Sequence, residues 1–98
     1  MKVSVVVPLY NEEDSIGLLY QAITDAIASE LSDYEILFVD DGSSDKTFAL
    51  AEQLASHDPK LRVLKFRRNY GQTPAMAAGI DHASGDIIVT MDGDLQND

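Results

Sequence analysis

Two carboxylates separated by a single glycine, Asp92 and Asp94, follow the last apolar run of the chain. Hard divalent cations take oxygen ligands, and Mg²⁺ commonly keeps its waters and uses only one or two protein carboxylates. A bound diphosphate could complete such a ligand set. The pattern therefore favours a site for a metal and a diphosphate. Asp-x-Asp is a common sequence, however, and a simple Asp-Gly turn is the structural alternative.

A second pair of carboxylates, Asp40 and Asp41, ends the apolar run over residues 34–39 and is followed by Gly42. Side chains of neighbouring strand residues point to opposite sides, and Gly42 can take a positive φ without strain. One carboxylate could therefore cap the turn while the other accepts the ring N–H of uracil or guanine. The alternative is that both carboxylates serve only the turn.

The first apolar run is followed by Tyr10 and Glu12. Tyr10 offers an aromatic face to a planar base, and Glu12 could accept a hydrogen bond from a base or a ribose. The alternative is a strand end followed by a helix start, where acidic residues interact favourably with the helix dipole.

Two adjacent arginines, Arg67 and Arg68, follow the third apolar run in a chain whose formal net charge is −10. A guanidinium fork matches the geometry of phosphate oxygens. Pairing with surface carboxylates is the alternative interpretation.

Several other chemistries find little support in the sequence. The Gly-rich signatures of dinucleotide-binding folds and P-loops are absent, and so is cysteine. His57 and His82 fall at predicted helix ends, where an imidazole suits the helix dipole. Strong net negative charge argues against nucleic-acid binding, and no apolar run approaches the ~20 residues of a membrane-spanning helix. We expect a cytoplasmic location, or the cytoplasmic face of a membrane.

Apolar runs of strand length alternate with amphipathic segments of helical spacing along the chain. The predicted strands cover residues 3–7, 34–39, 61–66 and 87–91, and the predicted helices cover residues 16–27, 48–55 and 74–83. Strands that are apolar throughout, joined by helices, predict an α/β fold with a mainly parallel sheet and helices on both faces. Right-handed crossovers then place residues 9–13, 40–45, 67–73 and the segment from 92 onward at the carboxyl edge of the sheet, where ligands bind in such folds.

Four segments together resemble the family 2 glycosyltransferases of GT-A fold, in the right order and across the whole chain. The form of these segments is most similar to the polyprenyl-phosphate glycosyltransferases. The segments are VVPLYNEE (residues 6–13), VDDGSSD (39–45), RNYGQ (68–72) and MDGDLQN (91–97).

The resemblance implies a role for each matching position and a divalent cation, Mg²⁺ or Mn²⁺. Asp40 would support the turn after the second strand, and Gln96 would be a further metal ligand beside Asp92 and Asp94. The nucleotide-binding residues implied are Pro8, Tyr10, Glu12, Val39, Asp41, Arg68, Asp92, Gly93 and Asp94.

The implied reaction transfers a sugar from a nucleotide-diphosphate sugar to a polyprenyl phosphate, with the cation stabilising the diphosphate leaving group. No helix follows the fourth predicted strand to cover it, so we expect residues 1–98 to be the N-terminal, nucleotide-sugar-binding part of a larger transferase domain. The acceptor-side catalytic residue and the membrane contacts would then lie beyond Asp98, and the chain alone would be inactive. The uncovered strand also predicts self-association into a homo-oligomer.

Two alternatives from other classes stay open. A phosphohydrolase of the haloacid dehalogenase type also places Asp-x-Asp after an apolar strand, but normally after the first strand, whereas here it follows the fourth. A non-catalytic nucleotide-binding module is the second alternative.

Overall fold

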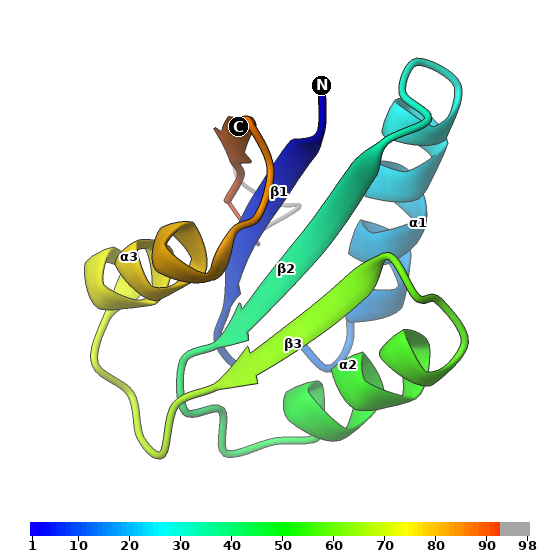
Figure 1. Ribbon diagram of the computed structural model, residues 1–98. Coiled ribbons are helices and arrows are strands. Elements are labelled where there is room, and N and C mark those ends of the chain that lie inside the picture. Colours follow the sequence, from blue (N-terminus) through cyan, green and yellow to red (C-terminus); the bar gives the residue numbers. More distant parts are fainter. Residues whose placement is uncertain (93–98) are drawn as a thin grey trace.

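The computed structural model describes residues 1–92 as one alternating series of strands and helices (Figure 1). The elements are β1 (Val3–Leu9), α1 (Ile16–Ala28), β2 (Tyr34–Asp40), α2 (Thr47–Ser56), β3 (Leu61–Lys65), α3 (Gln72–His82) and β4 (Ile87–Thr90). This order confirms the predicted α/β fold.

All four strands form one parallel sheet with the order β3-β2-β1-β4. Val5, in the centre of β1, pairs with Ile36 of β2 on one side and with Val89 of β4 on the other. The chain builds outward from β1 to β3 and then crosses to the opposite side of β1 for β4. The carboxyl ends of β1 and β4 therefore flank the point where the strand order reverses, which is where open α/β sheets form a binding crevice.

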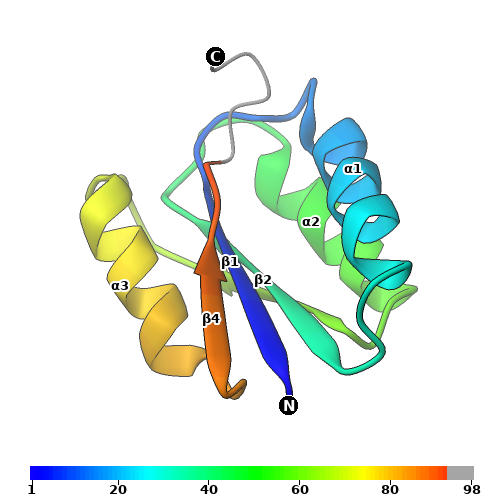
Figure 2. The same ribbon diagram turned by 90° about the horizontal axis from the view of Figure 1, so that it is seen from above.

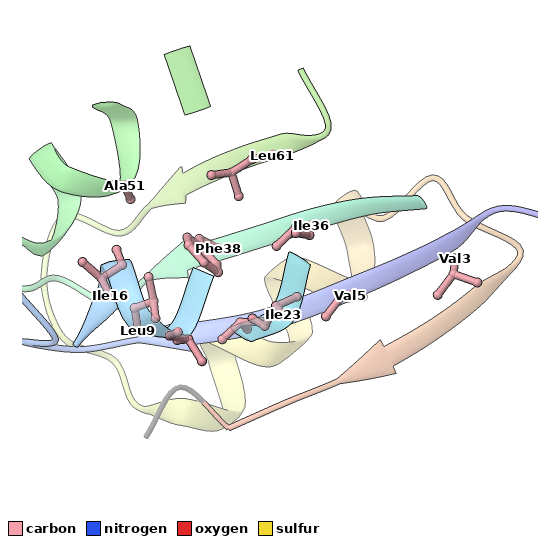
Figure 3. Close-up of a cluster of buried hydrophobic side chains, with 11 residues drawn as sticks. Val3, Val5, Leu9, Ile16, Ile23, Ile36, Phe38, Ala51 and Leu61 are labelled. Atoms are coloured by element: carbon pink, nitrogen blue, oxygen red, sulfur yellow. The ribbon is translucent and has the colours of Figure 1, made fainter. Parts of the chain in front are cut away.

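The helices cover both faces of the sheet, as predicted. Figure 2 shows α1 and α2 on one side and α3 on the other. Because strand side chains alternate between faces, Val5, Ile36 and Phe38 pack under α1 and α2 (Figure 3), while Val6 and Val39 pack under α3. This double burial explains why β1 and β2 are apolar on nearly every residue.

Pro8 was expected to end the first strand, but β1 continues through it to Leu9. The carbonyl of Val6 accepts a hydrogen bond from Met91 N, so the even-numbered backbone groups of β1 face β4. Pairing of β1 with β4 ends at Val6 and Thr90, two residues before Pro8. The missing N–H of Pro8 therefore costs no bond in the ladder, since that side of the strand has no partner strand at this level in residues 1–92.

Helix α3 begins at Gln72 rather than at the predicted Pro74. Gly71, with φ of 110°, turns the chain into the helix earlier. Pro74 is tolerated because N–H groups in the first helical turn have no intrahelical acceptor. Further along, a Cβ at Gly79 would fall on the Val6 side chain. The small residues of α3 thus permit its close approach to β1.

A buried carboxylate, Glu35, holds β4 at the amino end of the sheet. Glu35 is 5% exposed and accepts hydrogen bonds from Ser4 Oγ (2.6 Å), Ser84 N (2.7 Å) and Arg62 Nε (3.2 Å). Burial alone would raise the pKa of the Glu35 carboxyl, but the hydrogen bonds from Ser4 and Ser84, helped by Arg62, outweigh it and lower the pKa to about 2. The charge is therefore kept at neutral pH.

The side chains of β4 are exposed in residues 1–92, whereas the sequence predicted that only one face of this strand would lack a covering helix. Ile87, Ile88 and Val89 are each 39–43% exposed. No helix in residues 1–92 has the length and apolar character needed to span a membrane.

Candidate functional site

The loops that follow β1 and β2 are joined by hydrogen bonds at the carboxyl edge of the sheet. Asn11 N donates to Ser43 Oγ (2.9 Å), Ser44 N donates to Asn11 Oδ1 (2.9 Å), and Glu12 N donates to Thr47 Oγ1 (2.7 Å). Asn11 takes a positive φ of 51°, a conformation that asparagine tolerates better than most residues. These bonds fix the segment that carries Tyr10 against the loop that carries Asp41.

Asp45 and Glu13 complete the connection between these two loops. Asp45 accepts from Thr47 N (2.9 Å) and from Glu13 N (3.2 Å), while Lys46 N donates to Glu13 Oε1 (3.0 Å). Burial would raise the pKa of the Asp45 carboxyl, but hydrogen bonds from Thr47 and from backbone N–H groups outweigh it and lower the pKa. Asp45 is therefore a structural carboxylate at the start of α2.

Asp40 holds the turn after β2, as the resemblance implied. Its side chain is fully buried, and its carboxylate accepts from Ser43 Oγ (2.5 Å) and Ser43 N (3.3 Å).

Asp41, the adjacent carboxylate, connects β2 to the loop after β3. It is 2% exposed and accepts hydrogen bonds from Asn69 Nδ2 (2.9 Å), Tyr70 N (2.8 Å) and Gly71 N (3.0 Å). The contact between Asp41 and a base stays a prediction. The observed hydrogen bonds give Asp41 a structural role as well, because they hold the loop that carries Arg68.

Gly42 explains how closely these two loops approach each other. Its φ is 69°, and a Cβ on it would fall on the backbone of Arg68 and Asn69. Only glycine meets both conditions, the left-handed conformation and the direct backbone contact.

The remaining predicted residues of the first two loops differ in exposure. Tyr10 is 46% exposed at the carboxyl edge, and Glu12 is partly buried and accepts from Ser15 Oγ (3.1 Å). Pro8 and Val39 are buried, with the Val39 side chain in the core under α3. Tyr10 can therefore meet a ligand through its side chain, whereas Val39 can do so only through its backbone.

Arg68 lies on the surface of the 66–71 loop, with its guanidinium 5.1 Å from the centre of the Tyr70 ring and its Nε donating to Tyr70 Oη (3.1 Å). Within residues 1–92, neither Arg67 nor Arg68 has a carboxylate within 4.0 Å, since the ion pairs there involve Lys2 and Arg62 with Glu35. The alternative explanation of these arginines as partners of surface carboxylates therefore finds no support in that part of the chain.

The predicted metal site falls mostly outside the described residues. Asp92 follows β4 at the carboxyl edge, while Gly93, Asp94 and Gln96 lie beyond the described range. Within residues 1–92 no three acidic or histidine side chains come together as a metal site. The ligand set of Asp92, Asp94 and Gln96 stays a prediction.

Two other features lie away from this edge. His57 and His82 stand at the ends of α2 and α3, as expected from the sequence. A hollow of about 610 Å³ lies between α1 and α2, and its lining includes Leu18, Leu50 and Leu54 but none of the predicted site residues.

Sequence reasoning missed Asn11, Asn69 and Glu35. The signal for Glu35 was present, because a carboxylate within the apolar β2 run must find partners when it is buried. Asn11, between a strand and a helix, is of a type that tolerates positive φ. Asn69 carried no local signal, since its acceptor lies 28 positions away.

Known proteins that are similar to this chain in sequence are named as enzymes that act on polyprenyl phosphates. The chain is 46% identical over 99 residues to the dodecaprenyl-phosphate galacturonate synthase of Rhizobium johnstonii, covering all of this chain and 29% of that protein. It is 43% identical over 97 residues to a prophage bactoprenol glucosyl transferase homolog of Escherichia coli, covering 99% of this chain and 32% of that protein. It therefore spans about three tenths of the length of these relatives.

Solved structures with the same fold are glycosyltransferases of GT-A type. The Staphylococcus aureus TarS structure in complex with UDP has a TM-score of 0.80 at 27% identity, over 94% of this chain and 27% of that one. The mannosyltransferase PcManGT from Pyrobaculum calidifontis, in complex with GDP-Man and Mn²⁺, has a TM-score of 0.72 at 28% identity, over 92% and 26% of the two chains. Residues 4–98 also match the sequence model of glycosyl transferase family 2. The four motifs, the parallel sheet and these matches agree, and the chain belongs to glycosyl transferase family 2.

Proposed function

We propose that this chain is the nucleotide-sugar-binding part of a transferase that moves a sugar from a nucleotide-diphosphate sugar to a polyprenyl phosphate. One observation carries the proposal: hydrogen bonds join the loops after β1, β2 and β3 at the carboxyl edge of the sheet. These loops carry Tyr10, Asp41 and Arg68, and the chain belongs to glycosyl transferase family 2. Relatives named as acting on bactoprenol or dodecaprenyl phosphate support the choice of acceptor.

The base and the ribose would bind beside the β1 loop. Tyr10 would stack on the base, Glu12 would accept from the ribose, and Pro8 and Val39 would form the floor. Asp41 would lie at the base end of this pocket. Because its carboxylate already accepts from the 66–71 loop, a base N–H would share or replace one of those donors.

The diphosphate would bind between Arg68 and the end of β4. Asp92, Asp94 and Gln96 would hold Mg²⁺ or Mn²⁺, with Gly93 allowing close approach of the backbone. When bound, the cation would neutralise charge that develops on the departing nucleoside diphosphate. A neighbour that binds GDP-Man with Mn²⁺ supports the use of a divalent metal.

The acceptor needs little activation. A phosphate monoester carries about −1.5 to −2 charge near neutral pH, so its oxygen is already a nucleophile. The protein's main task is then to orient the donor and stabilise the leaving group. An acceptor-side basic group and contacts with the membrane surface are proposed to lie in the full-length protein outside residues 1–98, at the cytoplasmic face.

A binding and transfer experiment tests this function. We expect calorimetry to show that UDP or GDP binds this chain with an affinity that Mn²⁺ increases, and we expect the full-length protein to transfer a radiolabelled sugar to polyprenyl phosphate. This chain alone should bind without transfer. Lack of nucleoside diphosphate binding by the full-length protein, or phosphate release with no sugar transfer, would contradict the proposal; the second outcome would favour a phosphohydrolase.

A further inference from the structure

The buried carboxylate of Asp41 is occupied by a single loop. Asn69 Nδ2 donates to Oδ2 (2.9 Å) and also to the Asp41 carbonyl (3.2 Å), Tyr70 N donates to Oδ1 (2.8 Å), and Gly71 N is shared between Oδ2 (3.0 Å) and Oδ1 (3.3 Å). A buried anion needs such donors to offset its lost hydration. All of them come from three consecutive residues, so the carboxylate fixes the path of that loop.

Asn69 supplies the side-chain donor in this arrangement. Its amide contacts both the carboxylate and the carbonyl of Asp41, while its backbone lies where a Cβ on Gly42 would fall. The backbone N–H groups of Tyr70 and Gly71 could in principle turn to water in another loop conformation. The Asn69 amide adds the contact that selects this conformation.

Arg68 is the functional group that the fixed loop presents. Its backbone is pressed against Gly42, and its guanidinium stacks on Tyr70, whose own N–H is bound by Asp41. The guanidinium has no carboxylate partner within residues 1–92, in a chain of net charge −10. An oriented guanidinium that pairs with no carboxylate of residues 1–92 suits an anionic ligand.

We infer that Asn69 is a positioning residue: through the Asp41 carboxylate it holds the 66–71 loop so that Arg68 meets the diphosphate of the donor. The inference rests on the proposed function, in which Arg68 contacts the diphosphate. It assigns Asp41 an indirect effect on phosphate affinity in addition to any contact with the base.

The test separates phosphate binding from base binding by comparing UDP with uridine, and GDP with guanosine, in calorimetry with Mn²⁺. Asn69→Ala should weaken binding of the nucleoside diphosphate about tenfold and change binding of the nucleoside by less than about twofold. Arg68→Ala should show the same split. The double variant should bind the nucleoside diphosphate no more weakly than Arg68→Ala alone, because both substitutions remove the same contact, that between Arg68 and the diphosphate.

Gln21→Ala is the matched control, since the Gln21 amide also donates to a carboxylate, Asp25 Oδ1 (2.8 Å), but on the exposed face of α1. It should leave both affinities unchanged. Circular dichroism checks folding, and Asn69→Ser, which keeps a hydroxyl donor, takes the place of Asn69→Ala if the latter does not fold.

Four outcomes would overturn the inference. Equal loss of nucleoside and nucleoside diphosphate affinity would assign Asn69 to the base. Additive losses in the double variant would show that Asn69 does not act through Arg68. An unchanged affinity of the variant for nucleoside diphosphate would remove the positioning role while leaving the proposed function intact, whereas a wild-type protein that binds no nucleoside diphosphate would overturn both.

Discussion

Adjacent carboxylates at the end of β2 have different partners. Asp40 bonds within its own turn to Ser43, whereas Asp41 bonds to residues 28–30 positions further along the chain. The pleat of the strand directs neighbouring side chains to opposite sides, so one carboxylate stabilises the turn and the other joins two loops. This arrangement leaves the residues after β4 as the proposed source of metal ligands.

We predict that Asp94→Asn lowers sugar transfer by the full-length protein to less than about a tenth of wild type, a rise of more than about 1.4 kcal/mol in the activation barrier. The amide lacks the charge that binds the cation, and the fold should be unaffected. A radiolabelled-sugar assay measures the rate. Asp98→Asn is the control and should retain activity; retention of more than a tenth of the activity by Asp94→Asn would show that Asp94 is not the principal ligand.

At the scale of the elements, the two ends of the sheet depend on different polar contacts. The carboxyl end is built from loops in direct backbone contact at Gly42, and the amino end from the Glu35 cluster that holds the start of β4. Gly85 N donates to Ser4 Oγ (2.8 Å) and Asp86 N donates to the Lys2 carbonyl (2.7 Å), which extends the same attachment. Each end can be tested separately.

We expect Gly42→Ala to lower the free energy of unfolding by at least about 2 kcal/mol, because the new methyl group meets the backbone of Arg68 and Asn69 and the positive φ disfavours alanine. Gly17→Ala is the matched control. A Cβ at Gly17 meets nothing within 4 Å, so the change should raise the stability of α1 by about 0.5–1 kcal/mol. Urea denaturation measures both values, and equal effects at the two positions would refute the close approach.

The Glu35 cluster predicts a pH dependence of stability. The pKa of Glu35 falls from 4.5 to about 2 on folding, so its contribution is present above pH 4.5 and is lost as the pH falls toward 2. That contribution is on the order of 3 kcal/mol. Glu35→Gln should therefore destabilise the protein at pH 7 and much less at pH 2.5.

Urea denaturation of wild type and Glu35→Gln at the two pH values checks this dependence. Glu30→Gln, at an exposed position, is the control and should change stability little at either pH. A stability difference between wild type and Glu35→Gln that stays constant from pH 7 to 2.5 would show that the charge of Glu35 contributes nothing.

At the scale of the whole molecule, the sheet is covered unevenly. Helices shield β1, β2 and β3, while the three apolar side chains of β4 are each 39–43% exposed. Such a strand presents apolar surface to other molecules.

We predict that the 98-residue chain self-associates through β4. Val89→Lys, which places a charge on the strand, should reduce the apparent mass in light scattering. Leu18→Lys, on a helix surface where Leu18 is 69% exposed and so more accessible than Val89, should leave the mass unchanged. A monomeric wild-type chain would argue against this role for β4.

Local patterns along the chain predicted the type and approximate position of every helix and strand in residues 1–92, and the edge at which the polar motifs gather. Apolar periodicity and turn residues are local properties, and parallel strands joined by helices have their loops on fixed edges. Boundaries differed where a neighbouring strand decided them: Pro8 stays within β1 because pairing with β4 ends two residues earlier.

Which polar groups meet depends on how the strands and helices pack. The donors to Asp41 lie 28–30 positions away in the chain, and those to Glu35 lie as far as 49 positions away. Such long-range partners cannot be predicted from a local pattern. A carboxylate next to a turn can be exposed to water, can cap the turn, or can be buried against a distant loop. Only the packing of the strands removes water from Asp41 and Glu35, and the lost hydration then makes partners from distant loops necessary.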